Sequence, residues 1–179
     1  MNFFYWRAKS QKEWICLFMY EVIAIIIIQM MTYFLLTTTT TSLWIPDLSF
    51  GYSPTSLFQV YQTMGKKGRK LYLYLELFDT FLYSHGYVLV LSSVLEYMGV
   101  SSLLCFLPYG AWTADLIENG AQVYCLTFLD NDEMSTVWKQ VAMIGSYAVM
   151  TKWTFFVASL VILAKQLIFK GVKTQDKMT

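Results

Sequence analysis

The sequence predicts an all-α, polytopic membrane protein: a four-transmembrane-helix bundle with a short amphipathic surface helix in the first loop. Three observations predict it. The 179 residues are 56% hydrophobic and only 14% charged, whereas about 25% of residues are charged in ordinary soluble domains. Four apolar stretches are each long enough to cross the hydrocarbon core of a bilayer. Tyrosine and tryptophan residues gather near the ends of these stretches, as in interfacial belts.

The four membrane helices are expected at about 14–36, 71–95, 101–129 and 137–169, within a single membrane domain that covers 1–179. The first and fourth stretches each contain one deep charge. The second and third carry several acids, which would be costly against lipid and must therefore face the bundle interior. With four crossings, both chain ends lie on the same side. The tails carry more basic residues than the opposite side, which places them inside.

The long first loop contains a compact helix signal. Ser53 is a suitable N-cap, Pro54 suits the first helical position, and Gly65 suits the stop. Apolar residues recur at near-helical spacing between them. We therefore expect an amphipathic helix at about 54–64, lying on the membrane surface.

A basic cluster follows this helix, at the water edge of the second membrane helix: Lys66, Lys67, Arg69 and Lys70. Such a cluster is most often the solvated edge of a helix. It is also a candidate contact for an anionic lipid headgroup or an acidic loop of a partner.

Charged residues deep inside the stretches form the candidate site. At 1.5 Å per residue, Asp79, Asp115 and Lys152 lie roughly 12, 21 and 22 Å below the membrane face that holds the long loop. Three different helices thus bring charges to similar depths. The members of each set also share one side of their helix, because their spacing is three or four residues. The predicted intramembrane polar cluster is Glu76, Asp79, Asp115, Glu118, Asn119 and Lys152.

Two interpretations of this cluster compete. In the structural one, Lys152 pairs with Asp115 or Asp79 and fixes the packing of the helices. In the other, four acids facing one lysine form a site that holds protons, binds a cation or admits water. A pocket for a lipid or another hydrophobic small molecule is a third possibility, and we expect no other cofactor.

Part of this pattern resembles a group of small uncharacterised four-helix membrane proteins. The resemblance covers roughly residues 50–120. The matching residues are Gly51-Tyr52-Ser53-Pro54, Met64-Gly65-x-x-Gly68-Arg69-x-x-Tyr72, Asp79, Leu107-Pro108 and Asp115-x-x-Glu118-Asn119. It implies that Arg69, Asp79, Asp115, Glu118 and Asn119 belong to one site, and no function comes with it. The group often has a proline near the position of His85, which this chain lacks.

The expected function is that of a non-enzymatic accessory or structural subunit of a larger membrane complex, surrounded by lipid and other membrane subunits. The alternatives are a small proton- or cation-coupled carrier that uses the carboxylate cluster, and a membrane-embedded lipid-modifying enzyme. We identify no catalytic residues, since the single histidine, His85, has no recognisable nucleophile partner. No metal-ligand spacing occurs, and a net charge of +1 does not suggest a nucleic-acid partner. An organellar inner membrane or an endomembrane is favoured.

Overall fold

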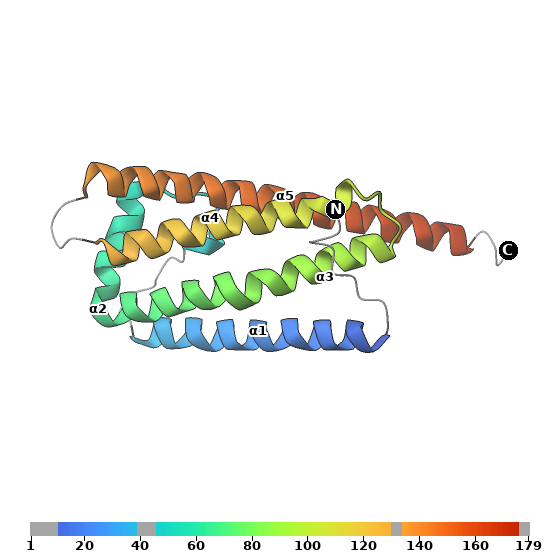
Figure 1. Cartoon of the computed structure of the whole chain (residues 1–179), viewed down its shortest axis with the longest axis horizontal. Coiled ribbons are helices and arrows are strands. Elements are labelled where there is room, and N and C mark those ends of the chain that lie inside the picture. The colour runs from blue at the N-terminus through green and yellow to red at the C-terminus, as the bar shows by residue number, and fades with distance from the viewer. Residues whose placement is uncertain (1–10, 39–45, 130–133, 176–179) are drawn as a thin grey trace, which may run out of the picture.

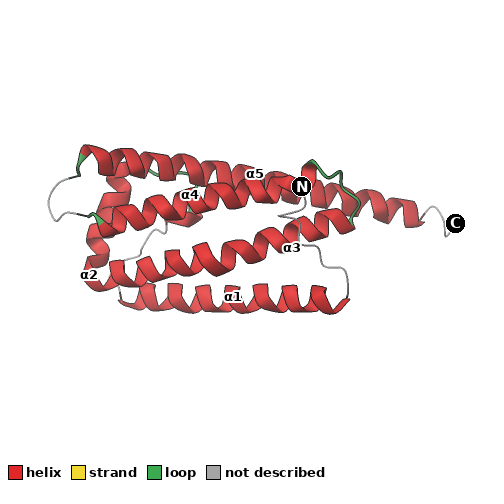
Figure 2. Cartoon of the chain, viewed as in Figure 1, coloured by secondary structure: helices red, strands yellow, loops and turns green. Residues whose placement is uncertain are grey.

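Helices form all the regular structure of the computed structural model, which describes residues 11–38, 46–129 and 134–175 (Figures 1 and 2). The main elements are α1 (Gln11–Thr38), α2 (Pro54–Phe78), α3 (Ser84–Tyr97), α4 (Leu107–Thr127) and α5 (Thr136–Gln175). The prediction of an all-α helical bundle is therefore confirmed. Two helices of the described residues are long and apolar enough to cross a membrane, over Ile15–Leu35 and Thr136–Ile168.

The long helices lie side by side and alternate in direction (Figure 1). The end of α4 and the start of α5 meet at the same end of the bundle as α2, whereas the start of α1 and the end of α5 lie at the other. The π-helical segment η2 (Asp79–Tyr83) joins α2 to α3 without a break. The residues from 66 to 97 therefore act as one rod of the bundle.

The first part of α2 crosses the end of the bundle before the chain turns along it (Figure 1). Ser53 caps this helix, because its hydroxyl accepts a hydrogen bond from the Ser56 N–H, and Pro54 occupies the first turn. Gly65 has φ +62°, a left-handed conformation that breaks the helix there. The predicted cap and stop are both confirmed.

The apolar side of this crossing helix packs on the protein itself. Leu57, Phe58, Tyr61 and Met64 are buried in a cluster with residues of α4 and α5. The Phe58 ring, for example, contacts the Trp138 ring edge to face at 5.5 Å. The expectation that this side faces lipid is therefore wrong, because the end of the bundle offers it a protein surface.

The start of α4 also differs from the prediction. The helix expected from 101 begins at Leu107, after the short 3-10 helix η3 (Leu104–Phe106). Pro108 lies in the first turn of α4, where its missing N–H leaves no hydrogen bond unmade. The helix therefore begins at this proline rather than at 101.

Small residues let the rods approach closely. A Cβ at Gly145 of α5 would lie 3.0 Å from the Ala121 Cβ of α4, and one at Gly110 would lie 3.1 Å from the Phe155 ring. Close contact of this kind is typical of helices that pack through van der Waals contact in membranes. Two apolar clusters fill the interior, one near α2 and one around Leu91, Leu95 and Cys105. The polar residues described below lie between them.

Gly86 of α3 faces side chains of α1. A Cβ there would overlap the Glu21 carboxylate and lie 2.9 Å from the Tyr20 ring. We predict that Gly86→Ala destabilises the protein by about 1–3 kcal/mol, because overpacking forces α1 away. Thermal unfolding in a mild detergent measures this.

Gly120→Ala is the matched control, since Gly120 lies in α4 and nothing lies within 4 Å of a Cβ there. It should leave stability unchanged or raise it, because alanine favours helix. Adding Glu21→Ala to the Gly86→Ala protein should restore part of the loss. Equal effects of the two glycine substitutions would contradict the proposed close contact.

Candidate functional site

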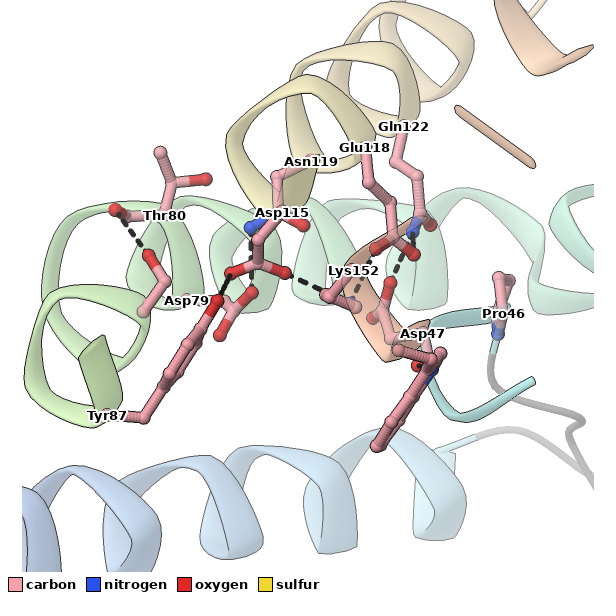
Figure 3. Close-up of polar contacts among 12 residues, drawn as sticks. Pro46, Asp47, Asp79, Thr80, Tyr87, Asp115, Glu118, Asn119, Gln122 and Lys152 are labelled. Atoms are coloured by element: carbon pink, nitrogen blue, oxygen red, sulfur yellow. Dashed lines mark hydrogen bonds and ion pairs between the residues drawn. The ribbon is translucent and has the colours of Figure 1, made fainter. Parts of the chain in front are cut away.

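Lys152 of α5 forms ion pairs with two acids of α4 (Figure 3). Its Nζ lies 3.0 Å from Asp115 Oδ1 and 2.5 Å from Glu118 Oε2. The three side chains are almost fully buried, with exposed fractions of 12% for Lys152, 3% for Asp115 and 0% for Glu118. Because unpaired buried charges are very costly, these contacts tie α4 to α5 at one register.

Asp79 and Asn119 form a second part of the site. The Asn119 side-chain amide donates to Asp79 Oδ2 at 2.7 Å, which links the start of η2 to α4. Tyr87 of α3 donates to Asp115 Oδ2 in a longer contact of 3.4 Å. Figure 3 shows these side chains converging on Asp115 from three elements. The structure thus brings together five of the six predicted residues of the cluster.

Glu76, the sixth predicted residue, lies one turn before Asp79 and is completely buried. Neither of its carboxylate oxygens accepts a hydrogen bond from the described residues. An ionised carboxylate left without partners in an apolar interior would be strongly unfavourable. Glu76 therefore adds to the number of acids that must be neutralised inside the bundle.

The π-helical turn η2 orients Asp79. The Ser84 N–H donates to the carbonyl of Asp79, five residues earlier, which widens the turn. Side-chain hydroxyl groups donate hydrogen bonds to backbone carbonyls around this turn. Thr80 donates to the Glu76 carbonyl at 2.7 Å and Ser84 to the Thr80 carbonyl at 3.1 Å. Single widened turns of this type are frequent at functional sites.

Gln122 and Asp47 belong to the same network and were not predicted. The Gln122 amide donates to Glu118 Oε1 at 3.2 Å and, in a shorter contact, to Asp47 Oδ1. Its carbonyl oxygen accepts hydrogen bonds from Tyr61 at 2.8 Å and Tyr72 at 3.1 Å. All the hydrogen-bonding capacity of this buried amide is therefore used.

Asp47 reaches the bundle interior on the short 3-10 helix η1 (Pro46–Leu48). Its side chain also accepts from the Tyr72 hydroxyl at 3.0 Å, whose single proton is shared between Asp47 and Gln122, and its carbonyl accepts from the Trp153 indole at 3.2 Å. Farther along the segment, the Tyr52 N–H donates to the Ser146 hydroxyl of α5 at 2.9 Å. The first loop thus contributes an acid to a site that otherwise consists of helix residues.

A cavity of about 250 Å³ lies beside this network. Asp47, Asp79, Asp115 and Lys152 line it, together with apolar and aromatic side chains and two neutral polar residues of α1. Three residues of α1 also line the cavity, namely Ile28, Gln29 and Thr32. The polar cluster therefore borders open space as well as packed protein.

The basic cluster of Lys66, Lys67, Arg69 and Lys70 lies where α2 turns into the bundle (Figure 1). The three lysines are exposed and Arg69 is partly buried. Within the described ranges, Arg69 forms no ion pair with the buried acids, which instead pair with Lys152. The structure does not bring Arg69 into the polar cluster, although the resemblance implied a shared site. A role of the four residues in binding a headgroup or partner stays a prediction.

His85 lies apart from these acids. Its ring packs edge to face on Trp112 at 5.2 Å, and its Nδ1 is buried without a hydrogen bond from the described residues. Among all the residues that the structure describes, no three histidine, cysteine, aspartate or glutamate side chains are grouped so that they could hold a metal ion.

Comparison with protein-family models, curated proteins and solved structures finds no match for this chain. The resemblance drawn from residues 50–120 therefore stays a prediction.

Replacement of Lys152 tests whether its ion pairs stabilise the bundle. We predict that Lys152→Met lowers stability by about 3–5 kcal/mol, because it leaves Asp115 and Glu118 buried without a cation. Thermal unfolding in detergent measures the loss, and Lys139→Met is the control because Lys139 is an exposed lysine of the same helix.

A triple variant carrying Lys152→Met, Asp115→Asn and Glu118→Gln should recover much of the lost stability, because no unpaired charge remains. If the triple variant is as unstable as the sum of its parts, the ion pairs are not what Lys152 contributes.

Proposed function

We propose that the chain is a multi-pass membrane protein with four crossings and acts as a small proton- or cation-coupled carrier. One observation carries the proposal: five carboxyl groups and one ammonium group gather beside a cavity. The acids are Asp47, Glu76, Asp79, Asp115 and Glu118, and the ammonium is that of Lys152.

The acids outnumber the bases in this cluster, and the excess negative charge must be relieved inside the bundle. Lys152 offsets one negative charge, so four more remain if every acid is ionised. Such a net charge in an apolar bundle is unfavourable, and the excess acids must therefore hold protons, bind a cation or be reached by water.

Four crossings are supported by the lengths of the rods. The two long apolar helices, α1 and α5, satisfy the requirement for a membrane span by themselves. The 21 residues of α4 measure about 31 Å at 1.5 Å per residue, close to the thickness of the hydrocarbon core. The rod from 66 to 97 is longer still. Its acids and those of α4 face the interior, as spans with charged residues require.

The arrangement suggests how a carrier would operate. Asp79 lies at the widened turn between α2 and α3, receives a hydrogen bond from Asn119, and lines the cavity. An acid in this position can exchange a proton with a cation that enters the cavity. Lys152 and its two acids hold α4 and α5 together while that exchange takes place.

A second candidate function is that of an accessory subunit in a larger membrane complex. The observation that favours it is the exposure of α1, on which large apolar side chains point outward on most sides, including Phe18, Ile26 and Phe34. Lipid or another membrane subunit would cover them.

Purification in a mild detergent followed by native mass spectrometry tests this, and a reproducible partner set would favour the subunit over an independent carrier. Residence in an organellar inner membrane or an endomembrane stays a prediction.

A membrane-embedded lipid-modifying enzyme is the third alternative, and we propose that the protein is not an enzyme. The packing of His85 on Trp112, away from the acids, supports this proposal.

Transport by the purified protein tests the carrier. Liposomes that contain the protein should show a proton flux across their membrane when a pH or cation gradient is imposed. Asp79→Asn should reduce this flux to that of protein-free liposomes, because the amide cannot exchange a proton. A pH-sensitive dye inside the liposomes follows the flux.

Glu96→Gln is the matched control, since Glu96 lies in the last turn of α3, far along the rod from Asp79. It should leave the flux unchanged. Folded protein that moves no protons, or an Asp79→Asn variant that moves them at the full rate, would refute the carrier.

A further inference from the structure

We propose that the cavity between α1 and α5 binds an amphiphilic molecule with a protonated amine head and an apolar tail. The inference rests on the proposed carrier and names the chemical class of its substrate. It follows from the uncompensated charge of two cavity acids, the aromatic walls and the position of α1.

Two of the three acids that line the cavity form no ion pair within 4.0 Å with the described residues. Asp115 is paired with Lys152. Asp79 receives a hydrogen bond from the neutral Asn119 amide, and Asp47 receives hydrogen bonds from a phenol and a neutral amide. A cation in the cavity would therefore be attracted to Asp79 and Asp47. An anion would meet both acids, while the one lysine is already held by two carboxylates.

Aromatic side chains in the cavity wall also favour the binding of an amine. Tyr83 and Tyr87 line the cavity on the side of η2 and α3, and their rings contact each other at 5.8 Å. Trp153 and Phe156 of α5 line it as well, and their rings pack edge to face at 5.8 Å. Aromatic faces attract ammonium groups, most strongly where water is excluded. The ring carbons of the same residues suit an apolar chain.

The remaining wall favours a molecule that is partly apolar. Ile28 and Thr32 of α1, with Leu48 and Leu75, line the cavity as well. One space of about 250 Å³ is therefore bordered both by acids and by apolar side chains. Binding sites for small molecules commonly combine an apolar lining with a few fixed polar groups.

The position of α1 gives such a molecule a route from lipid. α1 packs against α2, η2 and α3, and its residues Ile28, Gln29 and Thr32 line the cavity together with Lys152 and Trp153 of α5. Most of its other side chains are exposed. An amphiphile in the bilayer would therefore meet the cavity where α1 borders it, with its amine toward the acids.

Binding of dodecylamine to protein in a non-ionic detergent, free of amine lipids, tests the inference. Dodecylamine should raise the melting temperature, whereas dodecanol and dodecanoate at the same concentration should not, because only the amine carries a positive charge. Lysophosphatidylethanolamine shows whether a lipid headgroup can supply the amine in place of a free one.

Two variants localise the binding. Asp79→Asn should weaken dodecylamine binding by about tenfold or more, since it removes a buried charge partner. Thr32→Phe leaves every acid in place and fills the apolar wall, so it should weaken binding even if Asp79→Asn fails to fold. Glu96→Gln should bind dodecylamine as the unmodified protein does.

The results separate this inference from the carrier itself. Equal stabilisation by dodecylamine, dodecanol and dodecanoate, or unchanged amine binding in both variants, would overturn the inference. Proton flux in amine-free liposomes would then still support the carrier. Amine binding that needs Asp79, in protein that moves neither protons nor amine, would support the site and refute the carrier.

Discussion

The ion pairs of Lys152 with Asp115 and Glu118 are the interaction on which the rest of the structure depends. They lie between two apolar clusters, one near α2 and one around Leu91, Leu95 and Cys105. A shift of α5 along α4 by one turn would separate the ammonium from its acids, so the pairs determine the register of the two helices. Every other polar contact of the site is arranged around this register.

The first loop is part of the interior because of the same network. Asp47 could not be buried on a short 3-10 helix without the phenol of Tyr72 and the amide of Gln122. Their hydrogen bonds compensate its lost hydration. The indole of Trp153 holds the adjoining carbonyl. The loop therefore closes one side of the cavity and supplies an acid that no helix provides.

Sequence reasoning predicted what is local and periodic. The cap at Ser53 and the stop at Gly65 follow from the preferences of single residues, and the depths of Asp115 and Lys152 follow from the rise of a helix. Gln122 could have been added, since it continues the spacing of Asp115 and Glu118 on the same side of α4. Asp47 could not, because its position depends on where a loop folds in three dimensions. The burial of the crossing helix was missed for the same reason, since amphipathic spacing does not say whether lipid or protein covers the apolar side.

The π-helical turn at Asp79–Tyr83 has a further geometrical consequence. A helix advances by 100° per residue, so one extra residue in a turn rotates everything that follows by about that angle. The widened turn therefore sets the angular position of Tyr83 and Tyr87 relative to Glu76. If the extra residue moved along the rod, the tyrosines would swing around its axis while the acids on α2 stayed in place. The widened turn thus fixes the angle between the part of the rod that carries Glu76 and the part that carries Tyr87.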